Sequence, residues 1–428
     1  MGDGVAAIAL PLYAASITGN ARLVTGIYAA ELAPWLFLGR WLGARADRDR
    51  TPGATMVRAD LARSVALAAV AITVATGHGI VAVLYATAVI IGTGHVAHSA
   101  ATSRLLADLA RGPDLARING RLSAVEAAAV ALVGPAVGGF LFAAGHSVPF
   151  TVDAVSFALS AGMVVRWWHH ESPSTHPATA PDREGDGVDE VLLRRQRRRQ
   201  RSIVRHVTGG PVLGPLYMMA IAMGIGQAIV LSSLVLYARQ VLGLTAREYG
   251  IFMAITATGN IVAALLTPRW WTPTRTGPLL VFGHGIVAAS YLVLAHTHDP
   301  IVGCIALVGE AVGIATVSTI SPTLRIDYAR GRTGAVVTFF RQGIYTAHAV
   351  GAVAAGSLII AIGYRHSYQL ASIAEVAALV ALPALTRQLR QATAEPVAAV
   401  ADLSADPVAD PAGTRRWAGP ELAERPGW

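Results

Sequence analysis

The chain of 428 residues is apolar and basic: 54% of its residues are hydrophobic, 14% are charged, and the formal net charge at pH 7 is +8. Soluble domains carry about 25% charged residues, so this composition predicts a membrane protein. All 34 basic residues are arginine, which excludes a Walker-type phosphate loop and argues against an ATP-driven pump. The one cysteine, Cys304, excludes a disulfide framework.

Apolar stretches long enough to cross a bilayer, which takes about 20 residues, recur along the chain. We predict six of them, a long polar interval and six more. The first six cover residues 4–19, 24–43, 55–77, 79–101, 122–144 and 148–168. The second six cover residues 212–237, 248–268, 277–296, 301–322, 335–362 and 367–386. This pattern predicts an all-α integral membrane protein with about twelve transmembrane helices.

The first stretch, MGDGVAAIALPLYAASITGN, is shorter than the others. Its apolar run extends only from Gly4 to Thr18. A signal peptide would begin with basic residues, and none precedes this run. We therefore expect a first transmembrane helix that is short, or truncated because the natural start of the chain lies upstream.

Arginine alternates between the loops on the two sides of the predicted helices. The loops after the second, fourth and tenth spans and the central interval are rich in arginine, whereas the loops that contain TGHG, AGHS and HTHDP have none. Cytoplasmic loops of membrane proteins carry this excess of positive charge. The alternation predicts a multi-pass protein of the cell membrane with both termini in the cytoplasm.

The patterns divide the chain into four regions. Residues 1–168 are predicted to form an N-terminal six-helix half, and residues 210–388 a C-terminal half. The cytoplasmic linker at residues 169–209 contains the basic run RRQRRRQRSIVR, which either is a solvated loop or docks on anionic lipid. Residues 389–428, rich in Ala, Pro, Asp and Arg, are expected to be a disordered cytoplasmic tail.

The loop after the second span contains a short charged motif. It reads GARADRDRTPG, in which Gly43, Asp47 and Arg48 form a G-x-x-x-D-R pattern. Glycine allows close approach of helices, Asp can cap a helix N-terminus, and Arg can bind a partner carboxylate. The motif could therefore hold neighbouring helices together as a gate; the alternative is an ordinary basic loop.

The fifth span contains a second motif, LVGPAVGGF. Its marked residues are Gly134, Pro135, Gly138 and Gly139. Proline weakens the hydrogen-bond ladder of a helix, and the glycines let a neighbouring backbone pack closely. The motif predicts a helix that can bend and rock, although ordinary close packing is an alternative interpretation.

Six spans, a linker and six more, together with these motifs, resemble the major facilitator superfamily, whose two six-helix halves surround a central cavity. The charged loop resembles the gate signature of that family, but its continuation, Asp49 to Pro52, departs from the family pattern. The fifth-span motif resembles the antiporter motif of drug exporters. Four further stretches resemble the enterobactin-exporter-like multidrug efflux branch: the initial GDG with LPL, LARINGRLS, VDAVSFALSAG and LYARQVLGLTAREYGIF. The resemblance covers about residues 1–388.

The resemblance implies a secondary active transporter that exports small, partly hydrophobic, drug- or siderophore-like molecules by alternating access and proton antiport. The expected partners are a small-molecule substrate and the lipid bilayer, with no nucleic acid, no cofactor beyond the proton gradient, and a monomeric state. Two alternatives remain open, a proton-coupled uptake symporter and a non-transporting membrane sensor. Enzyme activity is not expected, because the chain has no H-E-x-x-H or G-x-S-x-G motif.

Proton antiport requires an ionisable side chain inside the protein, whose protonation changes the balance between conformations. The candidate acids are Asp3, Glu31, Glu126 and Glu310. The resemblance implies that the first, fourth, seventh and tenth helices line the cavity, so Asp153 and Glu375, on the sixth and twelfth, are set aside. The structural alternatives are a helix cap for Asp3 and an acid that holds helices together for the others.

Candidates for substrate contact are expected on the same helices. His95 and His98 are three residues apart on the predicted fourth helix and share one face, where they contact substrate or a proton, or are hydrogen-bonded in the interior. Met219 and Gln227 lie on the seventh predicted helix, and methionine surfaces accept varied ligands. Further apolar candidates are Trp35, Phe37, Tyr217, Met218 and Met223. No third ligand accompanies the histidine pair, so no metal site is predicted.

Overall fold

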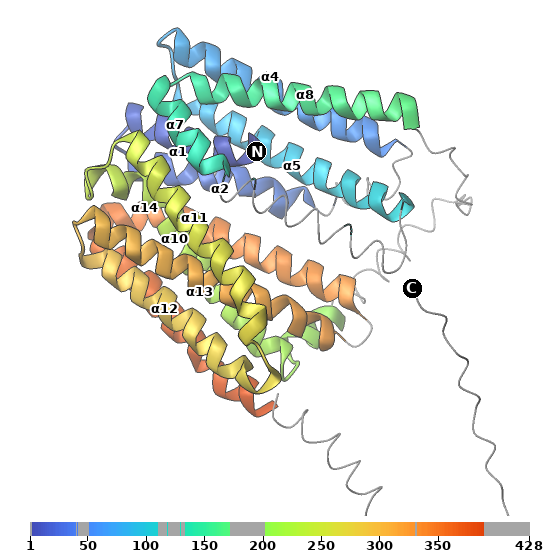
Figure 1. Ribbon diagram of the computed structural model, residues 1–428, viewed down its shortest axis with the longest axis vertical. Helices are drawn as coiled ribbons and strands as arrows, with labels where there is room; N and C mark the ends of the chain where they lie inside the picture. Colours follow the sequence, from blue (N-terminus) through green and yellow to red (C-terminus); the bar gives the residue numbers. More distant parts are fainter. Residues whose placement is uncertain are drawn as a thin grey trace, which may run out of the picture.

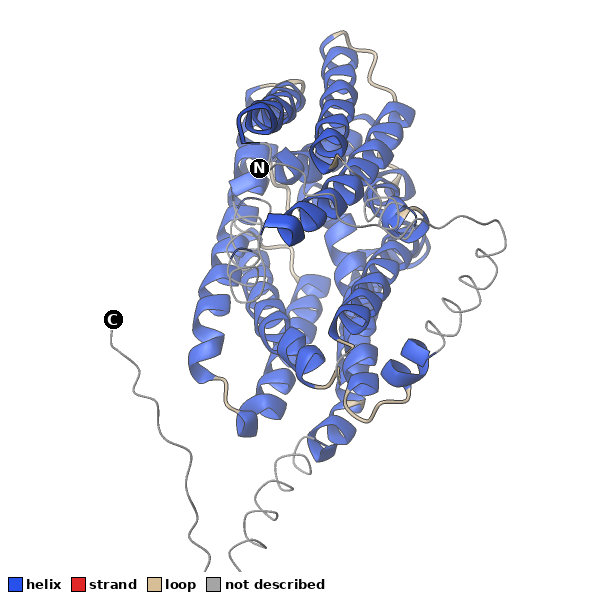
Figure 2. Ribbon diagram, turned by 90° about the vertical axis from the view of Figure 1, so that its right-hand side faces the viewer, coloured by secondary structure: helices blue, strands red, loops and turns tan. Residues whose placement is uncertain are grey.

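The computed structural model describes residues 2–39, 41, 51–109, 118, 129, 133–171, 202–329 and 332–388. The regular elements in these ranges are helices joined by short loops (Figure 2). The first group is α1 (Gly2–Ile17), α2 (Ala21–Phe37), α4 (Pro52–Ala75), α5 (Val81–Leu109), α7 (Gly134–Ala144) and α8 (Val148–Glu171). The second group is α10 (Leu213–Gln240), α11 (Ala246–Trp270), the short η2 (Pro273–Arg275), α12 (Thr276–His296), α13 (Pro300–Asp327) and α14 (Thr333–Val380).

Each of these α-helices coincides with a predicted span. The long α14 contains two of them, and its backbone leaves the helical conformation at Gly363, where φ is 76° and ψ is 172°. Glycine adopts this positive φ without the steric conflict that a Cβ would cause. Within the described residues, seven helices are long and apolar enough to cross a membrane, and α1 is a shorter apolar helix. The all-α class is confirmed, and the count of twelve spans stays a prediction.

Several helices begin at residues whose side chains satisfy free backbone N–H groups. Asn20 precedes α2 and its side chain accepts a hydrogen bond from the N–H of Arg22. Thr245 and Glu248 form a capping box at the start of α11. Asp299 accepts from two backbone N–H groups at the start of α13. These caps fix where the helices begin, independently of their apolar composition.

The helices pack in two groups that meet along a seam (Figure 1). In the first group α4 lies between α8 and α5, and α1 contacts α7 and α8. In the second group α10 and α12 both pack on α14, and α13 packs on α11 and α12. Across the seam α2 packs on α14 and α7 packs on α11. The division of the whole chain into two halves with a linker and a tail extends into residues outside the described ranges and stays a prediction.

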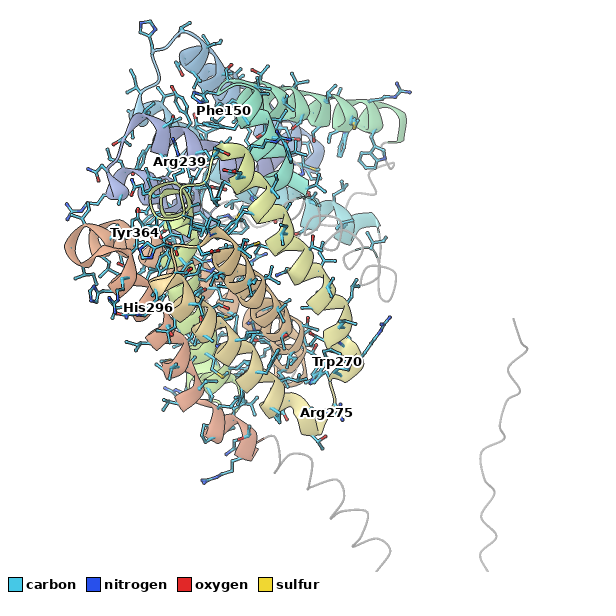
Figure 3. The ribbon with its side chains drawn as sticks, turned by 60° about the vertical axis from the view of Figure 1, so that its left-hand side comes forward. Phe150, Arg239, Trp270, Arg275, His296 and Tyr364 are labelled. Atoms are coloured by element: carbon cyan, nitrogen blue, oxygen red, sulfur yellow. The ribbon has the colours of Figure 1, made fainter. Side chains whose placement is uncertain are left out.

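The outward faces of the helices are apolar. Large aliphatic side chains are mostly exposed on α4, α8, α11 and α13, for example Val65 (69%), Met163 (70%), Leu265 (67%) and Ile305 (67%). Polar and aromatic residues occur at helix ends: Trp270 and Arg275 lie together near the end of α11, away from Arg239 at the end of α10 (Figure 3). An apolar girdle with polar ends is the pattern of helices that contact lipid.

Candidate functional site

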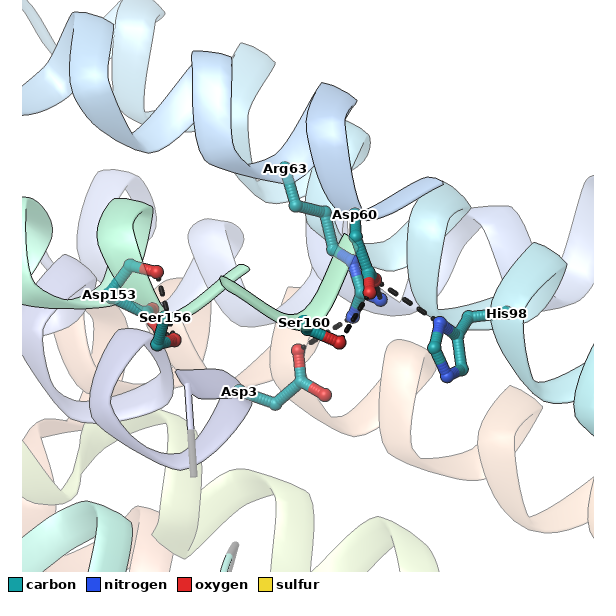
Figure 4. Close-up of polar contacts among 7 residues, drawn as sticks. All are labelled: Asp3, Asp60, Arg63, His98, Asp153, Ser156 and Ser160. Carbon is teal, nitrogen blue, oxygen red and sulfur yellow. Dashed lines mark hydrogen bonds and ion pairs between the residues drawn. The ribbon is translucent and has the colours of Figure 1, made fainter. Parts of the chain in front are cut away.

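A cluster of charged side chains joins helices of the first group around Arg63 on α4. The guanidinium Nη1 of Arg63 lies 3.1 Å from Oδ1 of Asp3 on α1 (Figure 4). Its Nη2 forms an ion pair with Asp60, one turn earlier on α4. The side chains of Arg63 and Asp60 are only 3% and 1% exposed, and that of Asp3 is 25% exposed. Two carboxylates therefore share one buried guanidinium.

Asp60 connects this ion pair to two further helices. Its Oδ1 lies 3.1 Å from Nδ1 of His98 on α5, and its Oδ2 accepts a hydrogen bond of 2.7 Å from the hydroxyl of Ser160 on α8 (Figure 4). The guanidinium of Arg63 also lies 4.2 Å from the centre of the Phe157 ring on α8. The cluster thus ties α1, α4, α5 and α8 together through charge-assisted contacts, which are stronger than neutral hydrogen bonds.

Asp153 on α8 lies beside this cluster. Its side chain is buried, its Oδ1 accepts a hydrogen bond of 3.1 Å from Ser156, and its Oδ2 has no hydrogen-bond partner. A Cβ on Gly2 would come within 2.2 Å of the same Oδ1, so the start of α1 packs directly on this carboxyl group. Asp3 and Arg63 both act on it electrostatically. The prediction had set Asp153 aside, yet it shares the environment of Asp3.

Glu31 on α2 is half-buried near the seam between the two groups. Asp3, His95 and Tyr28 interact with it electrostatically. The ring of His95 on α5 packs edge-on against Trp35, with 5.6 Å between ring centres, and Trp35 packs on Tyr345 of α14 at 4.6 Å. Glu31 and His95 thus belong to one side of the seam, next to the contact between α2 and α14.

The second helix group contains two buried carboxyl groups, each with a partner. Glu310 on α13 accepts a hydrogen bond of 2.9 Å from the hydroxyl of Tyr291 on α12. Glu375 on α14 lies 2.7 Å from Nδ1 of His284 on α12, and both side chains are fully buried. Glu375 was not among the predicted coupling residues, and the sequence alone does not pair it with His284, which is 91 residues away in the chain.

A cavity of about 90 Å³ lies among α10, α12, α13 and α14. Met219, Met223 and Gln227 line it from one face of α10, since they are four residues apart. Its other polar lining residues are His284, Ser318, Ser321, Arg325 and His348. Two of the apolar candidates point elsewhere, since Met218 is 63% exposed and Phe37 is 79% exposed. The described residues contain no group of three His, Cys, Asp or Glu side chains that could hold a metal ion.

The glycines of the fifth-span motif mark close contacts of α7. A Cβ on Gly134 would lie 2.5 Å from Cα of Gly4 on α1, and one on Gly139 would lie 2.4 Å from Cα of Gly250 on α11. A Cβ on Gly138 would lie 3.2 Å from the carbonyl oxygen of Val5 on α1. The motif therefore places α7 against a helix of its own group and against a helix across the seam.

The sequence matches the family model of the Major Facilitator Superfamily over residues 1–346. The chain belongs to this superfamily. Its members are transporters, so a transporter fold with membrane-spanning helices is established for this chain. No curated protein sequence matches it.

Solved structures of other superfamily members have the same fold. A bacterial homologue of the human lysosomal transporter Spinster, in an inward-facing and unoccupied conformation, is 14% identical, with a TM-score of 0.66 over 91% of this chain and 94% of that one. A bacterial homologue of the iron transporter ferroportin is 16% identical, with a TM-score of 0.65 over 90% and 95%. The D-xylose-proton symporter is 14% identical, with a TM-score of 0.60 over 89% and 94%. These likenesses show the fold, and they do not distinguish the multidrug branch from others.

Some of the residues predicted for the superfamily's moving parts lie outside the described residues. They are Gly43, Asp47 and Arg48 of the gate motif and Glu126 of the fifth span. Pro135 lies in the first turn of α7, and its side chain is outside the described set. The roles of all these residues stay predictions.

Replacing Gly139 by alanine is expected to separate α7 from α11, because the added Cβ would meet the backbone of Gly250. Overpacking of this kind costs about 1–3 kcal/mol. The measurement is bifunctional thiol cross-linking between cysteines placed at Phe140 and Arg247, where the guanidinium lies 5.7 Å from the phenyl ring, in a background without Cys304. The cross-linked fraction should fall.

The matched control is Gly162→Ala on α8, where nothing lies within 4 Å of the added Cβ. It should leave the cross-linked fraction unchanged. Equal cross-linking in the two variants would show that the contact of α7 with α11 is looser than described.

Proposed function

We propose that this superfamily member is a secondary active transporter of the cell membrane that exports small, partly hydrophobic, drug- or siderophore-like molecules in exchange for protons. The observation that carries the proposal is the buried cluster of Asp3, Asp60, Arg63 and His98. These titratable groups tie α1, α4 and α5 together, and Ser160 on α8 joins them through Asp60, which is what a proton-controlled contact between helices requires.

Proton binding acts on the ion pair between α1 and α4. Protonating Asp3 removes the charge that its carboxylate presents to Arg63, so the attraction between the two helices weakens. A ligand or proton shifts a conformational equilibrium only by its different affinity for the two states. An ion pair that is formed in one state and broken in the other supplies that difference. Asp60, held by Arg63, His98 and Ser160, remains the fixed partner of the guanidinium.

The cavity in the second helix group supports the proposed substrate class. Met219 and Met223 provide an adaptable apolar wall, while Gln227 and His348 provide polar contacts. The preference for export rests on the resemblance of the α7 motif to that of drug exporters. Both termini in the cytoplasm and a monomeric state belong to the same proposal, and the arginine pattern of the loops supports the placement of the termini.

The test is transport by the full chain in proteoliposomes with an imposed pH gradient. The probes are the lipophilic cation ethidium and the anion 1-naphthalenesulfonate, which keep their charges over the pH range used. Proton antiport predicts that a probe accumulates in vesicles with an acidic lumen and that a protonophore abolishes the accumulation. Accumulation in vesicles with an alkaline lumen would identify a symporter, and gradient-independent movement would contradict proton coupling.

A further inference from the structure

The cavity among α10, α12, α13 and α14 contains one full positive charge and no negative one. Arg325, in the last turn of α13, lines it, and none of the described residues that line it is acidic. The nearby carboxyl groups do not line the cavity: Oε2 of Glu375 contacts His284 while its Oε1 has no partner, and Glu310 accepts from Tyr291. The cavity therefore presents uncompensated positive charge to whatever enters it.

The guanidinium of Arg325 uses few of its five N–H donors. Its Nη2 donates one hydrogen bond of 2.9 Å to the hydroxyl of Ser321, and its Nε is buried without a hydrogen-bond partner. The group lies 4.4 Å from the ring centre of Phe340. Stacking of this kind holds a guanidinium in place and leaves donors at its edge, which match the two oxygens of a carboxylate.

His284 supplies a second unused polar atom at the same cavity. The side chain is fully buried, its Nδ1 is bonded to Glu375, and its Nε2 has no partner. When Glu375 is ionised it only accepts, so Nδ1 of His284 carries the hydrogen of this contact. In that tautomer Nε2 is a hydrogen-bond acceptor. Glu375 does not line the cavity, whereas His284 does. Nε2 therefore remains without a hydrogen-bond partner on a side chain that lines the cavity.

The remaining wall is apolar. Leu216, Met219, Leu280 and Ile344 line it. A ligand that matches this arrangement has an apolar body, one anionic group and a hydroxyl. An anion would also supply the counter-charge that Arg325 lacks, and an unpaired charge within a membrane-spanning helix bundle is unfavourable.

We propose that this cavity binds small amphipathic carboxylates that bear a hydroxyl group, with the carboxylate on Arg325 and the hydroxyl donating to Nε2 of His284. The inference names the substrate class of the exporter proposed above and rests on that proposal for transport. Binding itself can be measured without transport.

The experiment compares three ligands of nearly equal size, 4-hydroxyphenylacetate, its neutral amide and the cation tyramine. Their binding to the purified full-length protein in nanodiscs is measured by titration calorimetry. The acid is expected to bind about 10-fold or more tightly than the amide, since hydrogen bonds to charged groups contribute more than neutral ones. Tyramine is expected to bind most weakly. Equal affinities for the three ligands would overturn the proposal.

The variant Arg325→Gln removes the charge and is expected to weaken binding of the acid by about 10- to 100-fold while leaving binding of the amide unchanged. Retained binding of the amide shows that the variant is folded. The matched control is Arg275→Gln, at an exposed position in η2, which should change neither affinity. An equal effect of the two variants would contradict a role for Arg325.

The role of His284 is tested with phenylacetate, which lacks the hydroxyl. The wild-type protein should bind it more weakly than the hydroxylated acid, by about 2- to 10-fold for a neutral hydrogen bond. His284→Gln, whose amide can still donate to Glu375, should reduce that ratio. A ratio of one in the wild-type protein would remove His284 from the proposal.

These outcomes separate the two proposals. Arg325-dependent binding of the acid without gradient-driven movement of any probe would leave this inference standing and contradict the transport function. Gradient-driven movement of ethidium without preference for the acid would leave the transport function standing and overturn this inference.

Discussion

Replacing Arg63 by methionine is expected to destabilise the protein by about 3–5 kcal/mol, the usual effect of removing one partner from a buried ion pair. The guanidinium faces Asp60, which is 1% exposed, and Asp3 on the neighbouring helix. Without it, Asp60 would retain only His98 and Ser160 as partners. The variant should lose its monodisperse size-exclusion peak at a lower temperature than the wild-type protein.

The double variant Arg63→Met with Asp60→Asn tests whether the loss of stability comes from an unpaired carboxylate. Removing both charges should restore part of the lost stability, because no uncompensated carboxylate is then buried at Asp60. The control is Arg166→Met on the exposed face of α8, which should have little effect. If Arg63→Met melts at the same temperature as Arg166→Met, the cluster does not hold the four helices together.

Replacing Asp3 by asparagine is expected to abolish accumulation driven by a pH gradient. A gradient of about two pH units stores about 2.7 kcal/mol per proton, enough for about 100-fold accumulation with one proton exchanged per substrate. Asparagine keeps a hydrogen-bond acceptor for Arg63 and cannot be protonated in the physiological range. The variant should still exchange labelled for unlabelled substrate across the vesicle membrane, since that exchange needs no net proton movement.

The matched control is Asp299→Asn, because Asp299 caps α13 at an exposed site and asparagine is an equally good cap. It should accumulate substrate as the wild-type protein does. Glu31→Gln serves as a comparison, since Glu31 was predicted to couple protons as well. If Glu31→Gln loses accumulation and Asp3→Asn retains it, proton coupling resides on α2 and the assignment of Asp3 is wrong.

The fold could be predicted because each membrane span is a run of apolar residues, which the local sequence shows directly. Apolar runs predicted each described α-helix, and the resemblance to the superfamily was confirmed by the family match. The merged α14 was anticipated as two spans, because the polar residues after Gly363 interrupt its apolar run. Caps such as Asn20 and Asp299 shift the observed helix starts from the predicted ones, since they act through single hydrogen bonds rather than composition.

The charged clusters could be predicted only in part. Asp3, Glu31 and Glu310 were named as candidates because a single acidic residue stands out in an apolar run. Asp60 and Arg63 were overlooked, although their spacing of three residues in an apolar helix was a usable signal. The pairing of Asp3 with Arg63 joins residues 60 positions apart, and only tertiary packing creates it.

The residues that line the cavity could likewise be predicted only in part. Met219 and Gln227 were predicted from their helix, and both line it. The resemblance directed attention to the seventh and tenth helices, which correspond to α10 and α13. It gave no reason to place His284 on α12 or His348 on α14 at a cavity, although both histidines fall within predicted spans. Which neighbouring helix completes a cavity depends on how the bundle packs, and that arrangement is not encoded in any single segment.

The central claim is that substrate leaves in exchange for protons. Its most direct test uses vesicles that hold the full chain, a pH-sensitive dye and a high concentration of whichever fixed-charge probe is transported, ethidium or 1-naphthalenesulfonate. The vesicles are diluted into probe-free medium at the same pH, with valinomycin and equal potassium on both sides to prevent a membrane potential. Antiport predicts that the lumen becomes acidic as the probe leaves, for either orientation of the protein. A lumen that becomes alkaline, or that keeps its pH while the probe leaves, would contradict the account.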